Sequence, residues 1–170
     1  MKNFLQGKWL GHPLHGFLVH LPVALWPAAL AFDLLTRAGI GGNAFVQTSF
    51  YAIGLGLASA LLAIPTGLAD WLDVKRENPA WKLGLYHLIL NSILTGAALI
   101  NLGLRINTFQ TSASVALVPL SLSFLCTVLL LVSGYLGGRL VYNYGISVAR
   151  ASAEKRRQPT PMDRRLDRRN

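Results

Sequence analysis

Four histidines are the residues of this 170-residue chain best suited to ligate a metal. His12, His15 and His20 stand close together where the first long apolar segment begins, and His87 stands near the start of a later one. Asn91 follows His87 by four residues, so the two share one face of a helix. Neutral imidazole is a good ligand for iron, copper, nickel and zinc. A metal or haem site is therefore predicted, provided that the fold brings these side chains together.

The composition predicts that the histidines belong to a membrane protein. Apolar residues make up 52% of the chain and charged residues 14%, whereas about 25% of residues are charged in ordinary soluble domains. A membrane-spanning helix needs about 20 mainly apolar residues. We expect an all-α membrane protein, an antiparallel four-transmembrane-helix bundle, with spans at about residues 13–36, 44–69, 83–104 and 115–141.

The positive charges predict how this bundle is oriented. Fourteen of the sixteen lysines and arginines lie in residues 1–12, 70–82 or 139–170, and the other two are Arg37 and Arg105. Cytoplasmic loops are enriched in these residues, so both termini are expected in the cytoplasm. We divide the chain into a cytoplasmic N-terminus, a four-helix transmembrane domain and a basic, disordered cytoplasmic tail, at residues 1–12, 13–150 and 151–170.

The net charge of +9 also bears on partners. In a soluble protein it would suggest nucleic acid, but cytoplasmic flanks beside anionic lipid account for it here. The expected partner is therefore the lipid bilayer, and nucleic acid is not expected.

Helical periodicity predicts which faces of the spans are buried. In the first span, residues spaced by three and four positions share a single helix face, and a second series with the same spacing shares one face of the second span. Pro22 leaves the carbonyl of Leu18 without its helical partner and should kink the first span beside His20. Asp33 and Arg37 are expected to form an ion pair, because they are four residues apart on one helix. The two predicted faces are His12, His15, Val19, Pro22, Trp26, Ala29, Asp33 and Thr36, and then Gly56, Ser59, Ala63, Thr66 and Asp70.

Three functions remain open from the residues. First and third helices of an up-and-down bundle are usually diagonal, so their histidines can face one another across the core. The first candidate is haem b with axial ligands from His15 or His20 on one side and His87 on the other. Asn91 would lie beside that site, and Arg139 or Lys82 would meet the haem propionates. Such a protein would be an electron carrier, in contact with a redox partner or a respiratory-type complex.

The second candidate is a non-haem transition-metal site built from His12, His15, His87 and Asp70. The third is a structural or accessory membrane subunit without cofactor, in which these polar residues form hydrogen bonds between helices. Small residues in the spans also allow close contact in a homodimer. The sequence contains no catalytic motif, so it does not predict an enzyme.

Four motifs resemble a bacterial family of four-span membrane proteins known as domain of unknown function 2231, which implies that the spans lie in a bacterial inner membrane. The resemblance covers about residues 9–148, and members typically read His-Pro after the leucine of the first motif, whereas Gly16 follows His15 here. Some relatives look fused to Rieske-type or cytochrome-like domains, which implies a redox setting, and in some the position of His20 is not histidine. The motifs are Gly11-His12-Pro13-Leu14-His15, Gly67-Leu68-Ala69-Asp70-Trp71, His87 with Asn91, and Gly137-Gly138-Arg139-Leu140-Val141-Tyr142 with Gly145.

Overall fold

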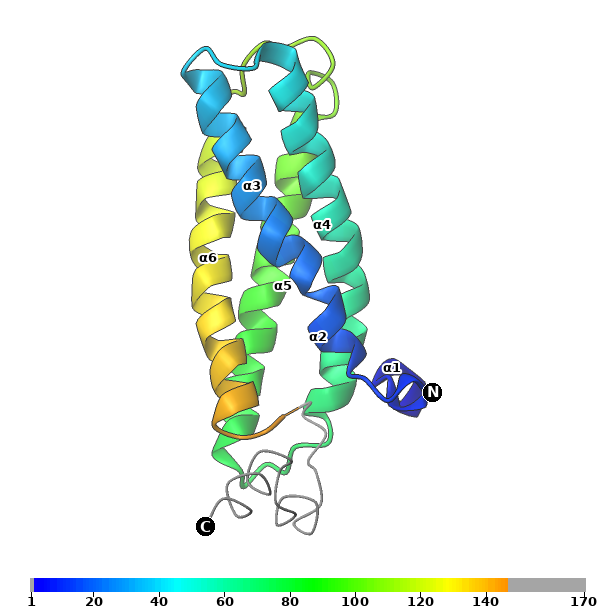
Figure 1. The fold of residues 1–170 in the computed structure, drawn as a ribbon. Coiled ribbons are helices and arrows are strands. Elements are labelled where there is room, and N and C mark those ends of the chain that lie inside the picture. Colours follow the sequence, from blue (N-terminus) through cyan, green and yellow to red (C-terminus); the bar gives the residue numbers. More distant parts are fainter. Residues whose placement is uncertain (1, 147–170) are drawn as a thin grey trace, which may run out of the picture.

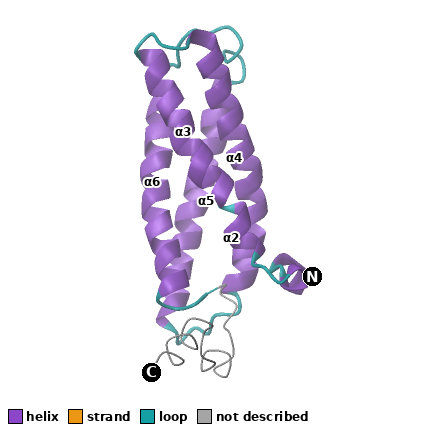
Figure 2. Cartoon of the chain, in the orientation of Figure 1, coloured by secondary structure: helices purple, strands orange, loops and turns teal. Residues whose placement is uncertain are grey.

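A computed structural model describes residues 2–146, which form an elongated bundle of helices without strands in that range (Figures 1 and 2). The basic tail expected at residues 151–170 lies outside the described part of the chain. In chain order the elements are α1 (Lys2–Leu5), the 3₁₀ helix η1 (Lys8–Leu10), α2 (Leu14–Leu18), α3 (His20–Arg37), α4 (Gly42–Trp71), α5 (Pro79–Arg105) and α6 (Leu117–Tyr142).

Four helical stretches are long and apolar enough to cross a membrane: Leu14–Arg37, Gly42–Trp71, Pro79–Arg105 and Leu117–Tyr142. The first combines α2 and α3. The predicted four-helix membrane bundle is thus confirmed. Helix α3 contacts α4 and α6, and α5 also contacts α4 and α6, so α3 and α5 are diagonal. The N-terminal segment and the α4–α5 loop lie at one end of the bundle, and the other two loops lie at the opposite end (Figure 1).

The buried faces follow the predicted spacing. Helix α3 buries Pro22, Trp26, Ala29, Asp33 and Thr36, and the buried residues of α4 include Gly56, Ser59, Ala63 and Thr66. Small residues on α4 let α3 approach closely. A Cβ atom at Gly56 would lie 2.5 Å from the indole nitrogen of Trp26, so only glycine accommodates the ring there.

The first span is interrupted where the sequence predicts it. Helix α2 ends at Leu18 and α3 begins at His20. Pro22 has no N–H to donate to the carbonyl of Leu18, and the hydroxyl of Ser59 on α4 donates to that carbonyl at 2.7 Å instead. The kink predicted beside His20 is therefore confirmed, and a neighbouring helix satisfies the freed backbone group.

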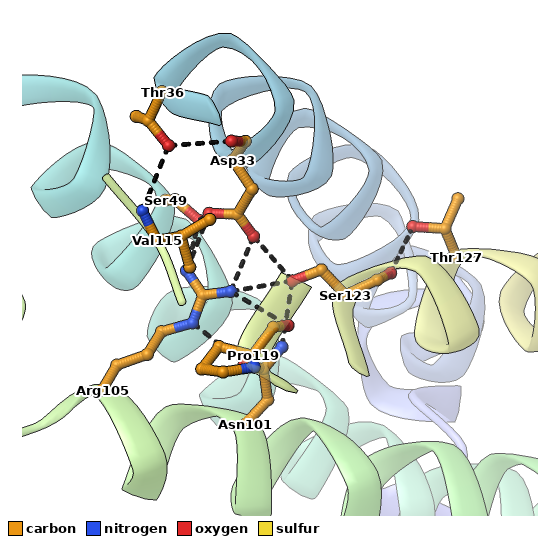
Figure 3. Close-up of polar contacts among 9 residues, drawn as sticks. All are labelled: Asp33, Thr36, Ser49, Asn101, Arg105, Val115, Pro119, Ser123 and Thr127. Carbon is orange, nitrogen blue, oxygen red and sulfur yellow. Dashed lines mark hydrogen bonds and ion pairs between the residues drawn. The ribbon is translucent and has the colours of Figure 1, made fainter. Parts of the chain in front are cut away.

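A buried ion pair joins all four long helices near the end that carries the α3–α4 loop (Figure 3). The Arg105 guanidinium on α5 donates to both carboxylate oxygens of Asp33 on α3, at 2.8 and 2.6 Å. Ser49 on α4 and Ser123 on α6 donate to the same carboxylate, at 2.6 and 2.8 Å. Asn101 accepts from Nε of Arg105 at 2.9 Å. The two charged side chains are only 2% and 0% exposed, so this network is sealed from solvent and lipid.

The predicted pairing of Asp33 with Arg37 is wrong. Arg37 is exposed, whereas Asp33 lies on the buried face of α3 and pairs with Arg105, 72 residues later. A carboxylate on that face needs a partner inside the bundle, because leaving a buried charge unpaired is costly. An ion pair between residues four apart on an exposed helix face stabilises the helix by only about 0.2–0.5 kcal/mol, so it does not compete with the buried pair.

The network leads to a double-mutant prediction. Asp33→Leu and Arg105→Met should each destabilise the bundle by about 3–5 kcal/mol, because each leaves one buried charge without its partner. The double variant should lose much less than the sum of the two. Unfolding in mixed detergent micelles measures these values, with Arg37→Met as the exposed matched control. Additive effects, or an equal loss in the control, would contradict the assignment.

Candidate functional site

Two of the four histidines meet inside the half of the bundle near the N-terminus. His15 on α2 and His87 on α5 have ring centroids 6.4 Å apart and ring planes at 85°. Both side chains are half-buried. They come from the diagonal first and third spans, so the predicted meeting of histidines across the core is confirmed for this pair.

Each ring is held by a backbone carbonyl on a neighbouring helix. Nδ1 of His15 lies 3.0 Å from the oxygen of Ala63 on α4, and Nδ1 of His87 lies 3.1 Å from the oxygen of Ser133 on α6. A carbonyl oxygen only accepts, so Nδ1 carries the proton in both rings. Neither Nε2 has a hydrogen-bond partner within residues 2–146, which leaves two lone pairs for a ligand. Metal-binding histidines are typically oriented in this way, through the other ring nitrogen.

Glycines make room for both rings. A Cβ atom at Gly67 on α4 would lie 2.7 Å from Cε1 of His15, and one at Gly137 on α6 would lie 3.0 Å from Cε1 of His87. The imidazoles therefore pack directly on the backbone of the adjacent helix. The resemblance motifs include both glycines, but helical spacing alone did not assign them this role.

Asn91 belongs to the hydrogen-bond network around His87, and its place beside a cofactor stays a prediction. Its amide donates to the carbonyl of His87 at 2.7 Å and to the hydroxyl of Ser133 at 2.6 Å. The same hydroxyl lies 3.3 Å from Nδ1 of His87. Ser133 is thus the central residue of this network. Helical spacing within one span does not reveal this role, because the position of Ser133 opposite His87 depends on how α5 and α6 pack.

The other predicted site residues differ in how far they are exposed. His12 precedes α2 and is exposed. His20 is also exposed, and its Nδ1 lies 3.3 Å from the carbonyl oxygen of Phe17 in the preceding turn. Asp70 is half-buried near the end of α4, and Arg139 is exposed near the end of α6. Within residues 2–146 no group of three or more histidine, cysteine, aspartate or glutamate side chains is placed to hold a metal ion. The four-ligand set of His12, His15, His87 and Asp70 stays a prediction.

Comparison with known protein families identifies one match. The family described as predicted membrane protein, domain of unknown function 2231 (DUF2231), matches residues 11–150. No curated protein and no solved structure matches the chain.

The close contact between glycine and imidazole predicts the effect of one added methyl group. Gly67→Ala should destabilise the bundle by about 1–3 kcal/mol and displace the His15 ring, because the new Cβ overlaps it. The ¹⁵N resonances of the imidazole report the displacement, and unfolding in micelles reports the stability. Gly96→Ala on α5 is the matched control, since no atom lies within 4 Å of its added Cβ. Equal effects of the two substitutions would contradict this packing.

Proposed function

This chain belongs to the membrane protein family of domain of unknown function 2231, and we propose that its His15–His87 pair ligates a redox-active metal centre. Haem b iron is the form that the ligand set favours. The protein would then be an electron-transfer subunit, in contact with a redox partner or a respiratory-type complex. The single observation that carries this proposal is the meeting of two imidazoles whose Nε2 atoms are both free to bind.

The number of converging ligands distinguishes haem from a bare ion. A haem macrocycle supplies four nitrogen ligands, so the protein has to add only one or two axial side chains. A tetrahedral ion such as Zn²⁺ takes three or four ligands from the protein. His15 and His87 meet inside this bundle, whereas His12 and His20 are exposed. Two ligands therefore suit an axial pair better than a complete non-haem site.

The spacing of the rings supports the same proposal. A metal–imidazole bond is about 2.0–2.1 Å long, which separates the centroids of two imidazoles on opposite sides of one metal by about 6 Å. The centroids of His15 and His87 lie 6.4 Å apart. Lys82 and Arg139 are exposed cations near the same end of the bundle, where they can meet propionates.

The tight packing of the rings favours a second candidate. Because both rings lie on helix backbone at Gly67 and Gly137, a macrocycle has to displace neighbouring side chains to reach the pair. A single soft ion, such as Cu(I), needs less room and accepts imidazole ligands. A redox role would be the same in both cases, but the absorption spectrum would differ.

Absorbance of the detergent-purified protein, oxidised and then reduced with dithionite, tests the proposal. Haem predicts a Soret band that shifts on reduction and is lost or displaced in His15→Ala and His87→Ala, because each removes an axial ligand. His12→Ala and His20→Ala are matched controls on exposed histidines and should leave the band unchanged. Metal analysis of the same samples identifies a bare ion, which should be lost in the first two variants only.

Other outcomes of this experiment decide against the redox proposal. A colourless, metal-free protein from a haem-replete, metal-replete host would leave a structural or accessory subunit in its place. A Soret band that survives both His15→Ala and His87→Ala would place haem on other residues.

We further propose that the bundle lies in the bacterial inner membrane with both termini in the cytoplasm. The support is the position of the cations. Lysines and arginines are frequent in the N-terminal segment and the α4–α5 loop and sparse in the loops at the opposite end, and cytoplasmic loops are enriched in these residues. Reporter fusions test this orientation. A cytoplasmic reporter such as green fluorescent protein should be active after residue 146 and inactive after Gly39, and the reverse pattern would contradict it.

A further inference from the structure

Residues 2–10 form a separate unit beside the bundle, which consists of α1 and η1 and which we call the N-terminal foot. It projects sideways near the end of α4 (Figure 1). Gly7 joins its two turns in the left-handed conformation, with φ 72°. A Cβ atom there would lie 2.1 Å from the carbonyl oxygen of His12, so the turn is tight as well as left-handed.

Polar contacts fix the foot to the end of α4. The buried Gln6 amide donates to the carbonyl of Ala69 at 3.1 Å and also to the Asp73 carboxylate. Lys2 forms an ion pair with the same carboxylate. Hydrogen bonds from Lys2 and Gln6 lower the pKa of Asp73, so this carboxylate stays charged at neutral pH. The foot is thus held at a defined level, where the spans end.

The outer surface of the foot is aromatic and unpartnered within the described chain. The rings of Phe4 and Trp9 are stacked, with centroids 5.4 Å apart and planes only 3° from parallel. Each of these two side chains is 61% exposed, and Leu10 beside them is 46% exposed. In the first span, Phe17 is also exposed, at 75%. Exposing such a surface to water is unfavourable, because covering apolar and aromatic area lowers the free energy.

We propose that the N-terminal foot lies in the headgroup region of the bilayer, with Phe4 and Trp9 inserted at the boundary of the acyl chains. Three observations support lipid as the occupant. The foot is attached at the end of a membrane-spanning helix, its stacked aromatic pair is exposed, and it carries a cation, Lys8. Tryptophan favours this depth because its ring is apolar and its N–H is polar, and lysine side chains can reach phosphate groups from there.

Fluorescence quenching of Trp9 in reconstituted vesicles tests the depth of the foot. The full chain is placed in phosphatidylcholine–phosphatidylglycerol vesicles that contain lipid brominated either near the headgroup or near the end of the acyl chain. The contribution of Trp9 is the difference between the wild type and Trp9→Phe, and Trp81→Phe is the matched control for loss of another tryptophan near the same end. Circular dichroism confirms that each variant keeps its helices.

The expected result is that bromine near the headgroup quenches Trp9 more strongly than bromine near the chain end, and that aqueous iodide quenches it weakly. The Trp9→Phe variant should lose this quenched component, whereas Trp81→Phe should retain it. Quenching by iodide without quenching by either lipid would overturn the proposal, since it places the foot in water. Protection from all three quenchers would also overturn it, because a protein surface would then cover the rings.

Discussion

A carboxylate and a guanidinium buried face to face between four helices set the strictest constraint on this bundle. Asp33 and Arg105 cannot meet unless α3 and α5 present fixed faces at a fixed depth, and the hydroxyls of Ser49 and Ser123 add the same requirement for α4 and α6. No water is available in a bilayer core to satisfy a group that misses its partner. The network therefore sets the rotation of each long helix at that end of the bundle.

The same constraint reaches the histidines at the other end. On α5, steps of three and four residues lead from Arg105 to His87, so the residues of this series lie on one face. The residues between them are Asn101, Ala98, Leu94 and Asn91. On the first span, similar steps lead from Asp33 back to His15. A rotation of these helices that places the ion pair inside the bundle therefore places both histidines inside it as well. The two rings therefore meet because of the helix period and because each of the two diagonal spans carries one buried charge.

Much of the fold could be predicted because it depends on local periodicity and length. The four spans, the buried face of α3 and the kink at Pro22 follow from residues that are close in sequence. The partner of Asp33 could not be found in this way. Arg37 was chosen because it is four residues away, and the correct partner depends on which helices are diagonal. Arg105 does carry a signal, since it shares the face of His87 and Asn91 on α5.

The candidate site was only partly predictable for a similar reason. His15 and His87 follow the helix period, and the structure brings them together. His12 precedes the first residue of α2, so the helical spacing that placed it beside His15 does not apply. His20 follows the interruption at Val19 and turns outward. The glycines that receive the rings depend on contacts between helices, which spacing within one helix does not reveal.

The apolar layer between the two polar clusters has an electrical consequence. Trp26, Leu57, Leu94, Cys126 and Leu130 belong to one buried cluster at the middle of the bundle. Within residues 2–146, no series of side-chain hydrogen bonds connects the Asp33–Arg105 network with the His15–His87 pair. A change of charge at the imidazoles is therefore not passed to Asp33 and Arg105 through side-chain hydrogen bonds of the described residues.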